Sequence, residues 1–167
     1  MTEPSDGAPD ERRFAFLFKS DQGLISASTW RRHAARLAAL LALLTLIWWV
    51  ISPFAEHDLA KQAFFDPAVI ATFVYLIFYA FAVLLIGICY YNLSAKRWRD
   101  RARPPSLAGL LPVAALCAGA AHWLQPRVTE VMPRFYVIGL DVLLVLILVW
   151  NIGELGFMRS RPQSGGQ

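Results

Sequence analysis

Four apolar stretches, each long enough to cross a lipid bilayer as a helix, constrain the fold more than any other feature. They cover residues 34–52, 68–91, 107–124 and 135–153. An α-helix rises about 1.5 Å per residue, so crossing a hydrocarbon core of roughly 30 Å takes about 20 residues. Apolar residues occur all the way round these stretches, unlike in a soluble amphipathic helix. The sequence therefore predicts an all-α membrane protein, a four-transmembrane-helix bundle.

Basic residues divide unequally between the two sides that four spans would create. The side that holds both termini and the connection between the second and third spans has thirteen, and the other side has three: Lys61, Arg127 and Arg134. Lysine and arginine in short loops stay in the cytoplasm. We therefore expect both termini to be cytoplasmic, with a single membrane domain at 14–158 between flexible cytoplasmic tails at 1–13 and 159–167.

The amino-terminal part of this domain carries phenylalanines at every second position: Phe14, Phe16 and Phe18. A period of two fits a short strand, and it also fits an interfacial segment whose rings face lipid. We favour the interfacial segment, because an isolated short strand would lack a pairing partner. Ser26 or Ser28 can cap the first span, and Asp66 can cap the second.

A basic cluster stands between the second and third spans: Lys96, Arg97, Arg99, Arg101 and Arg103, with Asp100 among them. Its first role is to fix the orientation. Each basic residue also adds roughly 1 kcal/mol of attraction to an anionic membrane surface. In a second interpretation Asp100 organises the cluster, because helical spacing brings Arg97 and Lys96 within pairing distance of it. Trp98 would then insert its ring into the lipid interface.

Two motifs resemble those of a family of small bacterial inner-membrane proteins catalogued as domain of unknown function number eight hundred and five. In "AKRWRDRAR", Lys96, Arg97, Asp100 and Arg103 match a family signature, while Ala102 replaces its glycine. Near the amino terminus the shared residues are Phe14, Phe16, Phe18, Gly23, Ile25 and Trp30. Leu24 and Ala27 stand where the family has arginines. The resemblance implies a multi-pass protein of the bacterial inner (cytoplasmic) membrane, and it implies no activity.

Asp141 and His122 are the polar residues that stand out inside the predicted spans. A carboxylate within the bilayer costs a few kcal/mol and should face the bundle. Because the third and fourth spans form an antiparallel hairpin, His122 can reach the depth of Asp141. The pair is either a proton- or ion-linked site or a structural contact. Near the cytoplasmic end of the fourth span, Glu154 is expected to pair with an arginine of the basic cluster.

Three further patterns predict how the helices pack. Thr72, Tyr75 and Tyr79 form a polar stripe suited to hydrogen bonds between helices. The pairs Ala114/Ala118 and Ala115/Gly119 have the small-xxx-small spacing of close helix contacts. Pro112 is expected to kink the third span.

The sequence carries no pattern of an enzyme, a metal site or a cofactor site. Cys89 and Cys117 have no metal-like spacing, and the topology separates them too far for a disulfide. The basic residues lack the aromatic interleaving expected of a nucleic-acid partner. We therefore expect a non-enzymatic accessory or interaction protein whose basic cytoplasmic face contacts anionic lipid headgroups, a membrane-protein partner or another copy. The alternative is a small transporter or channel subunit with a proton- or ion-linked site at Asp141.

Overall fold

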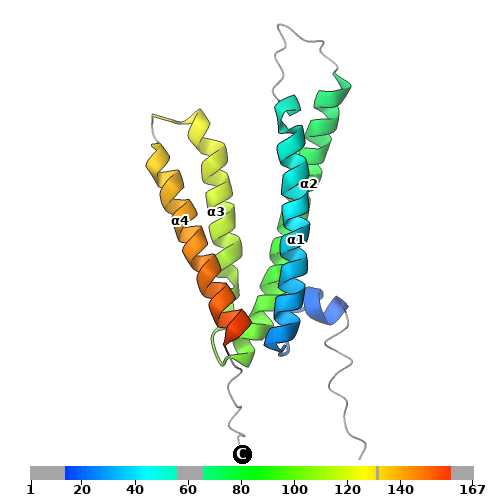
Figure 1. The fold of residues 1–167 in the computed structure, drawn as a ribbon, viewed down its shortest axis with the longest axis vertical. Coiled ribbons are helices and arrows are strands. Elements are labelled where there is room, and N and C mark those ends of the chain that lie inside the picture. Colours follow the sequence, from blue (N-terminus) through cyan, green and yellow to red (C-terminus); the bar gives the residue numbers. More distant parts are fainter. Residues whose placement is uncertain (1–13, 56–65, 131, 159–167) are drawn as a thin grey trace, which may run out of the picture. The chain divides into compact units, whose positions relative to one another are not determined.

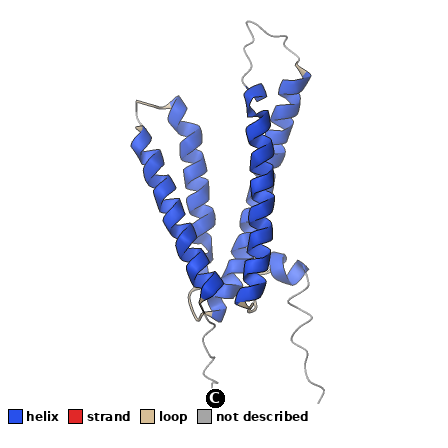
Figure 2. Cartoon of the chain, viewed as in Figure 1, coloured by secondary structure: helices blue, strands red, loops and turns tan. Residues whose placement is uncertain are grey.

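The computed structural model describes residues 14–55, 66–130 and 132–158, and the expected tails lie outside these ranges. All elements in these ranges are helices, as predicted (Figures 1 and 2). In chain order they are η2 (Ala15–Lys19), α1 (Ala27–Ile51), η3 (Ser52–Ala55), α2 (Pro67–Asp100), η4 (Pro105–Gly109), α3 (Leu110–Leu124), η5 (Gln125–Arg127), α4 (Arg134–Asn151) and η6 (Ile152–Phe157).

Within the described ranges, four helical segments are long and apolar enough to span a membrane, at the four predicted places. They cover Ala27–Phe54, Pro67–Asp100, Pro105–Arg127 and Arg134–Phe157. The predicted caps also form, because Ser26 Oγ accepts a hydrogen bond from the Thr29 amide at 3.2 Å and Asp66 accepts one from the Ala68 amide at 2.8 Å. The amino-terminal phenylalanines lie on and beside the helical turn η2, so the strand alternative is wrong.

The chain forms two compact units, and Ala34–Gly87 is one of them. It contains most of α1 and the first part of α2, joined by side-chain hydrogen bonds. The Tyr75 hydroxyl donates to the Leu44 carbonyl at 2.7 Å, and the Tyr79 hydroxyl lies 3.0 Å from Thr45 Oγ1. These two contacts confirm the predicted hydrogen bonding between helices. Thr72 differs, since its hydroxyl bonds the Ala68 carbonyl of its own helix.

The second unit combines the amino-terminal residues to His33 with the chain from Ile88 onward. Helices α3 and α4 pack as a hairpin in it, with Ala118, Ala121 and Val137 buried. The small pair Ala115/Gly119 instead stays on the surface. Pro112 lies in the first turn of α3, because the preceding residues form η4, so it does not occupy the interior position at which a proline kinks a helix.

Helix α2 continues past its apolar run to Asp100, so most of the basic cluster is helical. The helix ends in a Schellman motif. The Arg103 amide donates to the Trp98 carbonyl at 3.0 Å, and the Ala102 amide donates to the Arg99 carbonyl at 2.8 Å. Ala102 accordingly has a φ of 53°, a left-handed conformation that favours glycine.

Ala102→Gly should stabilise the protein by about 0.5 to 1 kcal/mol. The left-handed conformation costs an L-residue roughly 1–2 kcal/mol, and part of the gain is lost to the greater freedom of glycine in the unfolded chain. The unfolding midpoint in mixed detergent micelles measures the change. The matched control is Ala120→Gly on the exposed surface of α3, which should destabilise by about 1 kcal/mol. A loss of stability in both variants would contradict the strained cap.

Candidate functional site

The basic end of α2 presents two different faces to the rest of its unit. Helical spacing of three and four residues puts Asn92, Lys96 and Arg99 on one face, and Arg97 and Arg101 on another. The first face contacts the amino-terminal segment, and the second contacts the carboxyl end of the fourth span. We call this set of five residues the α2 clamp.

Lys96 lies at the centre of the first face and is 0% exposed. Its ammonium donates hydrogen bonds to the carbonyls of Leu17, at 3.4 Å, and Ser20. It also lies 5.0 Å from the centroid of the Phe16 ring. Backbone carbonyls and an aromatic face thus surround a buried positive charge, which the amino-terminal segment covers.

Two further contacts hold the same segment. Asn92 donates from its amide nitrogen to the Phe18 carbonyl at 2.6 Å, and Arg99 donates to the Asp21 carboxylate at 2.7 Å. The hydrogen bond from Arg99 lowers the pKa of Asp21 below its ordinary value of 3.8. The stabilisation by this ion pair is therefore present above pH 3.8, and it is lost as the pH falls through the lowered pKa.

Gly23 makes the turn between this segment and α1 possible. Its φ is 102°, and a Cβ at this position would lie 2.7 Å from an atom of the Phe16 ring. A side chain here would therefore be strained and would displace the ring that contacts Lys96.

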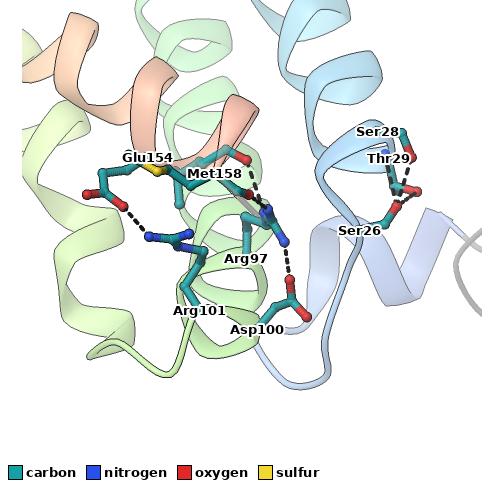
Figure 3. A network of polar contacts seen from close by, with 9 residues as sticks. Ser26, Ser28, Thr29, Arg97, Asp100, Arg101, Glu154 and Met158 are labelled. Atoms are coloured by element: carbon teal, nitrogen blue, oxygen red, sulfur yellow. Dashed lines mark hydrogen bonds and ion pairs between the residues drawn. The ribbon is translucent and has the colours of Figure 1, made fainter. Parts of the chain in front are cut away.

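On the second face, Arg97 binds the carboxyl end of η6 (Figure 3). Its side chain is 0% exposed, and its Nε donates to the Leu155 carbonyl at 3.0 Å. One terminal nitrogen donates to the Met158 carbonyl at 2.5 Å, and the other pairs with Asp100. The last carbonyls of a helix have no partner within the helix and carry partial negative charge, so a guanidinium fork suits them.

Arg101 and Arg31 also contact η6. Arg101 pairs with Glu154 at 2.7 Å, which confirms the predicted contact between Glu154 and the basic cluster (Figure 3). Arg31, from the first turns of α1, donates to the Gly156 carbonyl at 3.2 Å and lies over the Phe157 ring. Arginines from two different helices therefore bind the carbonyls of η6.

Two tryptophans fill the interior of this region. Trp98 is 1% exposed and packs against Trp150, with ring centroids 5.1 Å apart and ring planes tilted by 35°, so the prediction that it inserts into the lipid interface is wrong. Trp30 is 3% exposed and donates from its indole nitrogen to Ser94 Oγ at 3.2 Å. Sequence reasoning assigned no structural role to Trp30 or Ser94.

Burial removes two residues of the basic cluster from the predicted contact with lipid headgroups. Lys96 and Arg97 are fully covered by protein, so their charge is not available to a membrane surface. Asp100 pairs with Arg97, as predicted, whereas the hydrogen bonds of Lys96 go to carbonyls instead. Of the predicted cluster, Arg103 is exposed, and Lys19 and Arg32 are exposed elsewhere in the same unit.

The structure brings the intramembrane candidates His122 and Asp141 together. Nε2 of His122 lies 3.0 Å from each carboxylate oxygen of Asp141. The two side chains are 61% and 43% exposed, so the pair lies on the flank of the α3–α4 hairpin rather than inside it. Arg127, from the connection between the two helices, instead stacks on Trp123, with its guanidinium carbon 4.0 Å from the ring centroid.

Within the described ranges, no group of three or more histidine, cysteine, aspartate or glutamate side chains is placed to hold a metal ion. Cys89 and Cys117 are both free thiols. The candidate site therefore consists of the buried cations of the α2 clamp and the carbonyls that they bind. The His122–Asp141 pair is separate from it.

No family model, curated protein or solved structure matches the chain.

Arg97→Lys should destabilise the protein by about 3 kcal/mol. A single ammonium cannot reach the Leu155 carbonyl, the Met158 carbonyl and Asp100 together, and each lost hydrogen bond to a charged group costs about 1.5–3 kcal/mol. Chemical unfolding in detergent micelles measures this loss. The control is Arg103→Lys, an exposed position at which the change should stay within about 0.5 kcal/mol. Equal effects at the two positions would contradict the assigned contacts of Arg97.

Proposed function

We propose that this chain is a multi-pass protein of the bacterial inner membrane, with both termini in the cytoplasm. We further propose that it is a non-enzymatic accessory protein which presents a rigid cytoplasmic end to lipid and to partners. The observation that carries the second proposal is the α2 clamp, which joins the amino-terminal segment and the end of the fourth span.

The helix surfaces support insertion into a membrane. At most 17% of the most apolar window of any of the four spans is buried within the protein. Large apolar side chains remain exposed along all four, among them Leu43, Phe78, Leu116 and Leu146. A soluble protein rarely exposes apolar patches of this extent, whereas lipid tails would cover them.

The clamp supports a role in organising the cytoplasmic end of the protein. Lys96 and Arg97 are inside the protein and bind backbone carbonyls from segments far apart in the sequence. Such contacts give a fixed shape, and they provide neither a nucleophile nor a proton acceptor poised over a cavity. The geometry therefore favours a structural and binding role over catalysis.

Contact with anionic headgroups is proposed for the exposed residues Lys19, Arg32 and Arg103. Together they would contribute about 3 kcal/mol of attraction at an anionic surface, at roughly 1 kcal/mol each. The exposed ring of Phe14 adds an apolar anchor next to Phe18, 5.1 Å away between ring centroids. The turn η2 would then lie in the headgroup layer, as the interfacial-segment interpretation expects.

The transporter or channel alternative depends on Asp141. Its contact with His122 favours some role for this pair, and a transported proton or ion would need a water-accessible path to it. The position of the pair on the flank of a two-helix hairpin fits a surface contact better than an enclosed transport site.

Membership of the bacterial family that the motifs resemble remains part of this proposal. The position where that family has glycine is Ala102, whose positive φ is one that glycine adopts without strain. This agreement supports the resemblance on physical grounds.

Single cysteines should report the proposed orientation. In a chain with Cys89→Ala and Cys117→Ala, a membrane-impermeant maleimide added to intact bacterial cells should label Glu130→Cys. It should leave Arg103→Cys unlabelled until the cells are opened, because arginine-rich short loops stay in the cytoplasm. Labelling of Arg103→Cys in intact cells would overturn the orientation. Extraction of the chain by alkaline carbonate would overturn membrane insertion itself.

A further inference from the structure

The His122–Asp141 pair has hydrogen-bonding capacity that the described part of the chain does not use. Its contact occupies one nitrogen of the imidazole ring, Nε2, and leaves Nδ1 free to bond. A carboxylate accepts up to about four hydrogen bonds, and here both oxygens share a single ring nitrogen. If the hairpin lies in a bilayer, as proposed above, lipid tails cannot supply the missing partners.

The surface beside this pair lets another helix approach closely. On α3, Ala115, Gly119 and His122 follow at i, i+4 and i+7 and therefore lie on one face. Ala115 and Gly119 are exposed, and a Cβ at Gly119 would have no neighbour within 4 Å. Small residues on an exposed face allow two helix backbones to pack closely in a membrane. The polar pair His122–Asp141 lies beside these small residues, which distinguishes the face from a purely apolar one.

We propose that a second copy of this chain covers the face formed by Ala115, Gly119, His122 and Asp141. In this dimer His122 is an imidazolium, in which both ring nitrogens are donors. Around a two-fold axis along the membrane normal, Nδ1 of His122 in one copy donates to Asp141 of the other, and the reverse contact forms by symmetry. The proposal rests on the membrane location given under Proposed function, and it names the partner of this protein as itself.

Depth and charge favour a second copy over an unrelated helix. His122 and Asp141 are hydrogen-bonded to each other, so they lie at one level of the bilayer. A copy inserted with the same orientation brings its own donor and acceptor to that same level. Each pair combines a potential cation with an anion, so two pairs facing each other are complementary without any further residue. An unrelated helix would need a matching donor and acceptor at this depth.

Disulfide cross-linking in native membranes tests the proposal. The variant is Gly119→Cys in the full chain with Cys89→Ala and Cys117→Ala, treated with a mild copper oxidant. Paired cysteines need Cα atoms within about 7 Å, which the close approach at Gly119 would provide. We expect a covalent dimer of twice the chain mass. Ala115→Cys, on the same face, repeats the test if the cysteine at 119 disturbs packing.

The chain provides its own matched control. The native Cys117 is exposed and lies two residues from Gly119, which is about 200° around the helix at nearly the same depth. A chain that keeps Cys117 and has Cys89→Ala should give no covalent dimer. Equal cross-linking through Cys117 would indicate random collision and would overturn the proposal. So would a cross-linked product that contains a different protein.

The polar pair itself is tested by adding His122→Ala to the Gly119→Cys variant. Each hydrogen bond between membrane helices changes association by about threefold, so losing the symmetric pair should weaken dimerisation by about tenfold. Exchanging the two residues, with His122→Asp and Asp141→His in one chain, should restore it. Unchanged dimerisation in His122→Ala would remove the proposed contact.

Failure of this inference can be told apart from failure of the membrane proposal. The same membranes are washed with alkaline carbonate before oxidation. A chain that stays in the membrane without cross-linking at 115 or 119 overturns the dimer alone. A chain that the wash releases overturns the membrane location on which the dimer depends.

Discussion

Backbone carbonyls at the ends of helical segments need hydrogen-bond donors, and the α2 clamp supplies them as buried cations. Arg97 and Arg31 bond the carbonyls of Leu155, Met158 and Gly156, which no longer have partners within the last helix. Lys96 donates in the same way to the carbonyls of Leu17 and Ser20, within and just after η2. The unit around the end of α2 depends on these contacts, because an unpaired buried cation would cost several kcal/mol.

The contacts of the α2 clamp give the basic cluster a structural role inside the protein. Positive charge in a short connection fixes orientation in a membrane, and a surface role with anionic lipid is the simplest extension of that rule. Burial of Lys96 and Arg97 gives the same residues an internal role. In the proposed orientation, the charges that keep this end of the protein in the cytoplasm would also join its helical segments to each other. Exposed residues such as Arg103 remain accessible for the proposed contact with headgroups.

The sequence was sufficient to predict the type and the apolar parts of the long helices, because twenty-residue apolar runs have few other solutions. The predicted spans did not include the start of α1 at Ala27 or the continuation of α2 to Asp100. Local spacing also predicted the contact of Arg97 with Asp100, and antiparallel topology brought His122 to the depth of Asp141. The burial of Trp98 and the carbonyl partners of Lys96 were not predictable in this way. They depend on which segments meet at the end of α2, and backbone acceptors leave no signature in the sequence.

Hydrogen–deuterium exchange of two variants tests the two-faced clamp most directly. Lys96→Met removes the cation of one face, and Arg97→Met removes that of the other, with similar side-chain volume. We expect faster amide exchange in η2 for the first variant and in η6 for the second, while the opposite segment keeps its protection. Faster exchange of both segments in each variant, or of neither, would contradict a clamp with separate faces for the two ends of the chain.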